Sequence, residues 1–349
     1  MPDRRTASGQ RNRVSDQAVR ETLLTEVATL YFVDRFTQQQ IARQIGRSVA
    51  TVSRLLSEAE AKEIVEVRVR YPIPVVPELQ AALVERFGLR LARVVRATPD
   101  GSHGNLLSQV GDLAARHLTT LLADGSVISV GWGTSIYEVV RAVKAGPHRD
   151  IRVVQGLGSL GSRLPAIDNP LITQVLAERV NGTPHFLPAP MVVESTAIRD
   201  ALARDPQFRE TYSLCRRSDI ALVGIGLTDP EYSGMYRGGY VDSGILERIR
   251  ANGAIGDVMA EFFDLSGNIQ DTEINARVMG MRQAELRKVR TVIAVAGGVV
   301  KAPAILGAVR TGLIHVLVTD SATARRVIEL DDAASASPSS DTRSVRLAN

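Results

Sequence analysis

Cysteine, lysine and long runs of apolar residues are all scarce in this 349-residue sequence. The single cysteine, Cys215, excludes an internal disulfide and any cysteine-rich metal site, and we expect it in the core. The five histidines lack the spacing of metal ligands, and no serine lies in a nucleophile elbow. The sequence therefore predicts neither a metal site nor a cofactor.

The apolar runs are all shorter than the roughly 18 residues that a membrane-spanning helix needs. The start of the chain, with Pro2-Asp-Arg-Arg and Gln10-Arg-Asn-Arg, lacks the apolar segment of a secretory signal. We therefore expect a cytoplasmic protein with no membrane partner.

Charge is nearly balanced overall, with 42 Lys and Arg against 38 Asp and Glu, but the basic surplus is unevenly placed. Residues 1–70 hold 12 basic and 9 acidic residues, which leaves 30 and 29 for the rest of the chain. A modest excess confined to one module is typical of site-specific DNA binding rather than of a nonspecific basic coat.

Length and composition divide the chain into a small and a large domain. With 349 residues, 44% of them apolar, the sequence is long for one domain and can bury a large core. We place a helix-turn-helix domain over 17–70, a proline-rich linker over 71–77 and the large domain over 78–330. The polar leader 1–16 and the serine-rich tail 331–349 are expected to be disordered.

Residues 37–54 carry the pattern of two short helices joined by a glycine. Thr37 and Gln40 predict a capping box, and the first helix should end at Gly46. Ser48 is placed to cap the second helix. Apolar residues at helical spacing between 23 and 31 predict a further helix ahead of this pair, and the alternating segment 63–70 predicts the strand of a wing.

The second helix has one apolar face and one polar, basic face. Its apolar residues recur at i, i+3, i+4 and i+7 and must point inward: Val52, Leu55, Leu56 and Ala59. The residues that we expect to contact bases or phosphates are Gln38, Arg47, Ser48, Ala50, Thr51, Ser53 and Arg54. All three charged residues between 37 and 57 are arginines, whereas a solvated helical hairpin, the alternative interpretation, usually mixes acids with bases.

From residue 78 onward, short β-branched runs alternate with helical stretches. The runs cover 127–130, 151–154, 220–223, 291–295 and 314–318. Strands spaced in this way need crossover helices, which predicts an α/β domain with a parallel sheet covered on both faces. Ligands of such sheets bind outside the carboxyl ends of the strands.

The first of these runs ends in Gly131-Trp-Gly-Thr-Ser135 and leads directly into a helical stretch. Gly131 and Gly133 let the backbone close on an anion, the amides at the helix start can donate to it, and Thr134 and Ser135 add two hydroxyls. The pattern predicts a phosphate site, although the same residues would also serve as an ordinary helix cap.

The run at 291–295 leads to Ala296-Gly-Gly-Val-Val-Lys301. Because 38 of the 42 basic residues are arginines, a lysine at this position is notable. A compact ammonium at the mouth of a buried strand fits a phosphate or sugar oxygen, and a lysine in a surface loop is the alternative.

Other polar residues near strand ends are candidates for the same cleft. Asp264 can accept sugar hydroxyls or brace the turn that follows it. Gln155, Arg163 and Asn169 lie at or beyond the end of the second run. The segment 156–161 matches a dinucleotide fingerprint, but prolines interrupt the helix that must follow, so NAD binding is not expected.

The run from 30 to 69 resembles the DNA-binding domain of SorC-type transcriptional regulators of bacterial sugar operons. The resemblance rests on Thr37-Gln-Gln-Gln-Ile-Ala, Thr51-Val-Ser-Arg-Leu-Leu and Ile64-Val-Glu-Val. Where the family usually has Arg-Pro, this chain has Val49-Ala50, a departure that concerns which bases are read and not the docking mode.

The large domain is similar to the effector domain of the same family, through Val130-Gly-Trp-Gly-Thr, Leu187-Pro-Ala-Pro190, Gly253-Ala-Ile-Gly-Asp257 and Gly297-Gly-Val-Val-Lys301. This resemblance implies the Rossmann-like fold of ribose-phosphate isomerase and glucosamine-phosphate deaminase, and a phosphorylated sugar as effector. By position, Thr134, Ser135 and Lys301 would hold the phosphate. It also implies a tetramer whose helix-turn-helix pairs bridge operator half-sites.

Two functions follow from these patterns. The favoured one is a regulator of a sugar or polyol catabolic operon, with operator DNA and a phosphorylated sugar or polyol as its partners. The alternative is a sugar-phosphate isomerase or deaminase with an appended DNA-binding module, for which Asp264 is the candidate general base.

Overall fold

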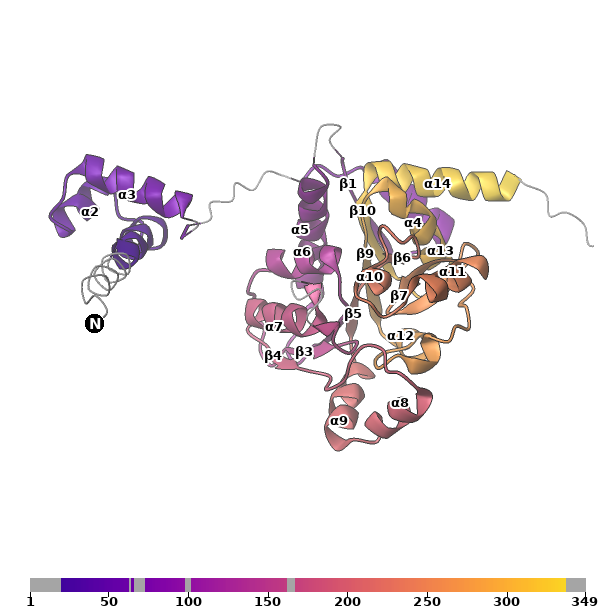
Figure 1. Ribbon diagram of the computed structural model, residues 1–349. Helices are drawn as coiled ribbons and strands as arrows, with labels where there is room; N and C mark the ends of the chain where they lie inside the picture. The colour runs from indigo at the N-terminus through magenta and orange to yellow at the C-terminus, as the bar shows by residue number, and fades with distance from the viewer. Residues whose placement is uncertain (1–19, 63, 66–72, 98–101, 162–166, 337–349) are drawn as a thin grey trace, which may run out of the picture. The chain divides into compact units, whose positions relative to one another are not determined.

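The structure is a computed structural model that describes residues 20–62, 64–65, 73–97, 102–161 and 167–336. Contacts within it divide the chain into two compact units, Met1–Pro72 and Ile73–Asn349 (Figure 1). The predicted leader 1–16 and most of the predicted wing strand 63–70 lie outside the described residues.

The small unit is helical. Residues 20–28 form a helix that continues into the π-helical turn η1 (Thr29–Val33), and α2 (Gln38–Gln44) and α3 (Val49–Ala61) follow. The capping box of Thr37 and Gln40 starts α2 as predicted, and Ser48 caps α3 by accepting a hydrogen bond from the Thr51 N–H at 3.1 Å. Gly46 makes the turn between them with a φ of 65°. The predicted inward residues Val52, Leu55, Leu56 and Ala59 are all buried.

The large unit is built on a seven-stranded parallel sheet in the order β1-β10-β9-β5-β2-β3-β4. Its strands are β1 (Leu91–Val95), β2 (Val127–Val130), β3 (Arg152–Gln155), β4 (Thr183–His185), β5 (Ile220–Gly224), β9 (Thr291–Val295) and β10 (Val316–Asp320). The predicted parallel sheet is therefore confirmed. The strand predicted at 314–318 begins two residues later, while β1 and the three-residue β4 were not predicted.

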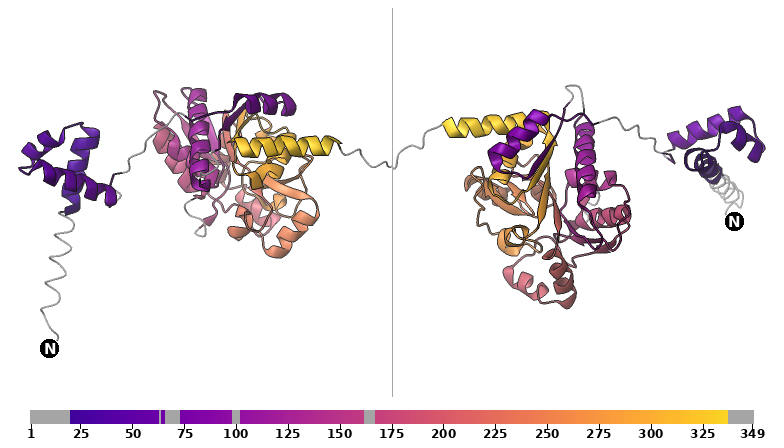
Figure 2. Two further views of the ribbon diagram at one scale, coloured as in Figure 1. Left: turned by 90° about the horizontal axis from the view of Figure 1, so that it is seen from above. Right: turned by 180° about the vertical axis from the view of Figure 1, so that it is seen from behind.

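Helices cover both faces of this sheet (Figure 1). One face packs against α5 (His103–Leu121), α6 (Thr134–Ala142) and α7 (Asn169–Val180), and the other against α4 (Pro77–Phe87), α13 (Ala302–Arg310) and α14 (Ser321–Ala336). Figure 2 shows the same two helical layers from two other directions. Cys215 is buried in the core as expected, and burial raises the pKa of its thiol to about 12.

A smaller antiparallel sheet follows β5 in the chain, with the order β6-β7-β8. Its strands are β6 (Gly226–Leu227), β7 (Ala254–Val258) and β8 (Glu261–Asp264). Met259 and Ala260 form the two-residue turn between β7 and β8, with φ values of 54° and 60°. The remaining helical segments are α8 (Thr196–Leu202), α9 (Pro206–Cys215), α10 (Gly234–Arg237), α11 (Ser243–Ala251), η4 (Asn275–Arg277), α12 (Gln283–Leu286) and η5 (Val299–Lys301).

Both predicted boundaries of the large domain need correction. Residues 73–77, assigned to the linker, belong to the large unit, because the Val76 N–H donates to the Val94 carbonyl at 3.0 Å and α4 starts at Pro77. The tail predicted to be disordered from 331 is helical to Ala336, because Asp331 forms an ion pair with Arg310 at 2.6 Å. Residues 337–349 lie outside the described part of the chain.

Candidate functional site

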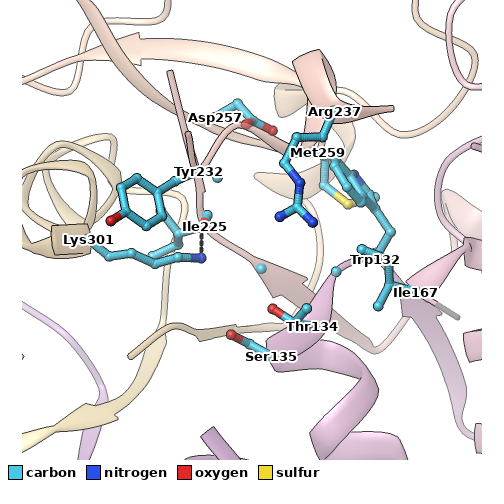
Figure 3. A pocket seen from close by; sticks show the side chains of 15 residues that line it. Trp132, Thr134, Ser135, Ile167, Ile225, Tyr232, Arg237, Asp257, Met259 and Lys301 are labelled. Carbon is cyan, nitrogen blue, oxygen red and sulfur yellow. Dashed lines mark hydrogen bonds between the residues drawn. The ribbon is translucent and has the colours of Figure 1, made fainter. Parts of the chain in front are cut away.

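A cavity lies at the carboxyl ends of β2, β5 and β9, which are neighbours in the sheet. Strand order reverses between β2 and β5, and open α/β sheets bind ligands at such a reversal. The cavity has a volume of about 640 Å³, including space open to solvent. We call it the central pocket. Its lining residues are Gly131, Trp132, Gly133, Thr134, Ser135, Ile167, Gly224, Ile225, Gly226, Tyr232, Gly234, Arg237, Asp257, Met259 and Lys301 (Figure 3).

The β2–α6 turn forms one wall of the central pocket. Gly133 occupies the N-cap position of α6 with a φ of 111°, a conformation that side chains rarely adopt, and it supplies no side-chain cap. The first N–H groups of α6 are therefore available to a ligand. Ser135 is buried, and its hydroxyl oxygen has no hydrogen-bond partner among the described residues. Thr134 is exposed beside it, and both hydroxyls lie on this wall (Figure 3).

Lys301 enters the central pocket from the opposite wall. It follows β9 at the end of η5, and its Nζ donates to the Ile225 carbonyl oxygen at 2.8 Å (Figure 3). Burial lowers the pKa of this ammonium, and the charge of Asp257 acts in the other direction. Two of the three ammonium protons remain for a ligand.

Asp257 is a buried carboxylate that the sequence did not single out. It lies on β7 and accepts a hydrogen bond from the Ala260 N–H at 3.2 Å. Burial raises its pKa to about 6, against the opposing effects of that N–H and of Lys301. A Cβ at Gly226 would lie 2.0 Å from Asp257 Oδ1, so this close approach of β6 and β7 requires glycine.

Arg237, at the end of α10, is the second cation of the central pocket. Its guanidinium points to the middle of the cavity, toward the Thr134 and Ser135 wall (Figure 3). This guanidinium makes no hydrogen bond or ion pair within the described part of the chain. The indole of Trp132 packs on the backbone of Gly234, where a Cβ would lie 2.3 Å from Trp132 Cη2. This contact links α10 to the β2–α6 turn.

The structure brings together five of the seven predicted effector residues, namely Gly131, Gly133, Thr134, Ser135 and Lys301. The other two, Asp264 and Gln155, do not line the central pocket. Asp264 braces its own turn by accepting from the Asn268 N–H at 2.9 Å, and it does not line the cavity. Gln155 is buried and holds the backbone, donating to the Leu157 carbonyl at 2.7 Å and accepting from the Leu187 N–H at 3.2 Å.

The two weaker candidates, Asn169 and Arg163, are not among the described residues that line the central pocket. Asn169 is fully buried and donates to the Leu157 carbonyl at 3.0 Å, outside the central pocket. Arg163 lies outside the described residues. Arg237 and Asp257 were missed because they reach the cavity from α10 and β7, and no local motif marks either one.

A second cavity lies between α8, α9 and residues 278–282, and four arginines line it. Arg199 is already bonded to Asp200 at 2.6 Å, and Arg282 to Glu261 at 2.8 Å. None of the predicted site residues lines this cavity, so the candidate effector site is the central pocket.

In the small unit, α3 presents the predicted polar face. Arg47, Ser48, Ala50, Ser53 and Arg54 are exposed, while Gln38 and Thr51 are partly exposed. Arg20 anchors the preceding helix to α3 through a 2.6 Å ion pair with Glu58, which lies beyond the predicted contact residues. The α2–α3 pair thus has the geometry of a helix-turn-helix, with the first turns of α3 free of acidic side chains.

A parallel α/β domain with a cation-lined pocket, joined to a separate helix-turn-helix unit, defines a class of protein: DNA-binding regulators that respond to a small ligand. The comparisons with known proteins agree. The sugar-binding domain family matches residues 73–329.

Relatives match along nearly the whole chain. The deoxyribonucleoside regulator of Bacillus subtilis is 31% identical over 311 residues, covering 88% of this chain and 98% of the relative. The transcriptional regulator LsrR of an Enterobacter species is 29% identical over 95% of this chain and 99% of its own. The crystal structure of the full-length sorbitol operon regulator SorC from Klebsiella pneumoniae superposes with a TM-score of 0.69 at 26% identity, covering 88% of this chain and 98% of that one.

The chain belongs to the SorC-type family of sugar-binding transcriptional regulators. It is a sugar-responsive regulator and not an enzyme, because these relatives are regulators. The isomerase or deaminase alternative is therefore wrong, and Asp264, its candidate base, lies outside the central pocket. No helix in the described ranges is long and apolar enough to cross a membrane.

Proposed function

We propose that this regulator controls a sugar or polyol catabolic operon and that its effector is a phosphorylated sugar or polyol bound in the central pocket. One observation carries the proposal: the buried, unpartnered hydroxyl of Ser135 lies in the uncapped first turn of α6, across the same cavity from Lys301 and Arg237. A phosphate can use all of these donors at once, since backbone amides, hydroxyls and cations are its usual ligands.

The groups on the other side of the cavity suit the sugar. In this proposal the phosphate binds the turn around Gly131 and Gly133, with Thr134, Ser135 and Lys301. The buried carboxylate of Asp257 accepts hydrogen bonds from sugar hydroxyls. Relatives named for deoxyribonucleosides and for a sorbitol operon support a sugar or polyol as the ligand class.

The DNA-binding part of the proposal assigns operator contacts to the exposed face of α3 and to Gln38 at the start of α2. In this proposal Arg47 and Arg54 supply the charge, and Ser48, Ala50, Thr51 and Ser53 contact bases or phosphates. We further propose that the protein acts in the cytoplasm as a homotetramer, the assembly that the family resemblance implies. Sedimentation of the full chain with and without operator DNA tests this assembly.

Trp132 provides the test of the ligand, because this only tryptophan lines the central pocket. Fluorescence of the full-length protein is titrated with pentose, hexose and polyol phosphates, with each unphosphorylated parent compound as its control. We expect at least one phosphorylated compound to change the emission saturably, and its parent to bind at least tenfold more weakly. Equal responses to both forms, or no response to any, would contradict a phosphorylated effector.

A further inference from the structure

The side chains of Asp320 and Ser321, adjacent at the junction of β10 and α14, each hold a different segment of the large unit. One segment carries Lys301 into the central pocket. The other anchors the part of the chain that follows the linker. We propose that this pair positions both segments together and thereby couples effector binding to the DNA-binding unit. The inference rests on the proposed function, because it takes the central pocket as the effector site.

Asp320 holds the loop that carries Lys301. Its carboxylate is fully buried, and Oδ2 accepts from the Gly298 N–H at 2.8 Å and from the Thr323 hydroxyl at 2.6 Å. Gly298 has a φ of 99°, a conformation that favours glycine, and its carbonyl accepts from the Lys301 N–H at 2.8 Å. The position of η5, and with it the Lys301 ammonium, is therefore fixed relative to β10.

Ser321 holds the opposite segment. Its hydroxyl is buried and accepts a hydrogen bond from the Ala97 N–H, just beyond β1, at 3.0 Å. The preceding residue, Arg96, donates its N–H to the Pro74 carbonyl at 2.7 Å. Residues 73–76, the first described residues after the linker, are thus attached to the end of β1, which Ser321 secures.

Only a few bonds connect the two segments. From Gly298 the connection runs through the Asp320 carboxylate, one peptide bond, the Ser321 hydroxyl and the 96–97 backbone to Pro74. Neither Asp320 nor Ser321 lines the central pocket, so both act on it only through other residues. If a bound phosphate displaces Lys301 and η5, Asp320 and Ser321 transmit this displacement. It then reaches both the start of α14 and the 96–97 backbone that holds Pro74. A ligand that binds two positions of this junction unequally shifts the equilibrium between them.

Ser321→Ala is the informative variant, because it removes the bond to Ala97 and leaves the Asp320 carboxylate and the pocket residues in place. Ser335→Ala, in the same helix, is the matched control: its exposed hydroxyl donates to the Asp331 carbonyl. Both are made in the full chain. The probe is the sugar phosphate that changes Trp132 fluorescence most in the wild type, and the DNA is a duplex selected from a random pool by the wild type.

We expect Ser321→Ala to bind the probe, and the operator without probe, within about twofold of the wild type. The probe-induced change in operator Kd should shrink at least fivefold, while Ser335→Ala keeps it. Hydrogen exchange gives a second readout, because a purely structural role of Ser321 would not change the exchange response to the probe. In the wild type the probe should alter exchange in both 297–301 and 94–97, and in Ser321→Ala only in 297–301.

Coupling equal to that of the wild type in Ser321→Ala, or an unchanged exchange response at 94–97, would overturn the inference. A wild type that binds no member of the panel would instead refute the proposed function, so the two failures are distinguishable.

Discussion

At the scale of single residues, the central pocket owes its character to the charged side chains that line it. Lys301, Arg237 and Asp257 come from three separate elements and share one cavity. Burial lowers the pKa of Lys301 and raises that of Asp257, so both groups bear a desolvation cost that surface residues avoid. Such perturbed groups in a cleft are typical of a binding site.

Lys301→Ala should weaken effector binding by about 10- to 150-fold, which corresponds to a hydrogen bond to a charged group worth about 1.5 to 3 kcal/mol. Trp132 fluorescence measures the affinity. Operator binding without effector should stay intact, so the variant no longer responds to effector. Lys288→Ala, which removes an exposed lysine outside the pocket, is the control. A Lys301 variant with wild-type response would remove this lysine from the site.

Asp257→Asn should stabilise the free protein at neutral pH. The carboxyl has a folded-state pKa of about 6 and a reference value of 3.8, so the folded state holds its proton more tightly. Asp257 therefore lowers stability increasingly as pH rises from about 4 to about 6, and by a constant amount above that. Urea unfolding of wild type and variant across this range measures the difference. A difference that stays the same from pH 4 to pH 8 would contradict the raised pKa.

Arg54→Ala should weaken the operator complex. If Arg54 contacts a phosphate, the salt dependence of binding should fall by about one ion, and if it contacts a base, the base selectivity should fall. Titrations at several salt concentrations and against mutated operators separate the two. Arg43→Ala, on the exposed side of α2 and outside the predicted contacts, serves for comparison. An unaltered operator affinity of Arg54→Ala would show that Arg54 does not contact the operator.

Residue-level prediction found side chains that line the central pocket where one short segment carries the whole signal. Thr134 and Ser135 follow a strand and start a helix, and Lys301 stands at a strand end in a chain that otherwise uses arginine. Asp264 and Gln155 lie outside the central pocket, because a polar side chain at a strand end can equally satisfy nearby backbone groups. Only the contacts of the folded chain show whether such a side chain is free to bind a ligand or is bonded to the backbone.

At the scale of elements, caps and periodicity predicted the helices of the small unit, and β-branched runs predicted five strands of the parallel sheet, since those signals are local. The β7–β8 hairpin was missed because its turn uses Met259 and Ala260 at positive φ, whereas Asn and Gly are the residues that usually mark such turns. The helical end of α14 was missed because its stability depends on ion pairs with Arg310 and Arg86, which are distant in sequence.

The small unit depends on few core residues, and this leads to a prediction about α3. Leu55 is 1% exposed in the cluster that joins α2 and α3 to the preceding helix. Leu55→Ala should destabilise this unit by about 2 to 5 kcal/mol, enough to unfold a small helical domain. Limited proteolysis should then cleave within 20–62, and operator binding should be lost, while the Trp132 response to effector persists. Ser57→Ala, at an exposed position of α3, is the control. Operator affinity unchanged by Leu55→Ala would contradict this role of α3.

At the scale of the whole molecule, the chain combines two units with separate cores. One unit carries the helix-turn-helix and the other the central pocket, so regulation requires that binding in one alter the other. An effector changes DNA affinity only if it binds two states of the protein unequally, and the coupling must be reciprocal. Operator DNA should therefore change effector affinity by the same factor by which effector changes operator affinity.

The most direct test of the central claim is fluorescence anisotropy of a labelled operator duplex, titrated with the full-length protein at fixed salt. It is done with and without a saturating sugar phosphate, whose occupancy Trp132 reports independently. We predict that the operator Kd changes at least fivefold when the pocket is occupied. The same operator Kd in both titrations, with the pocket shown to be saturated, would contradict the account.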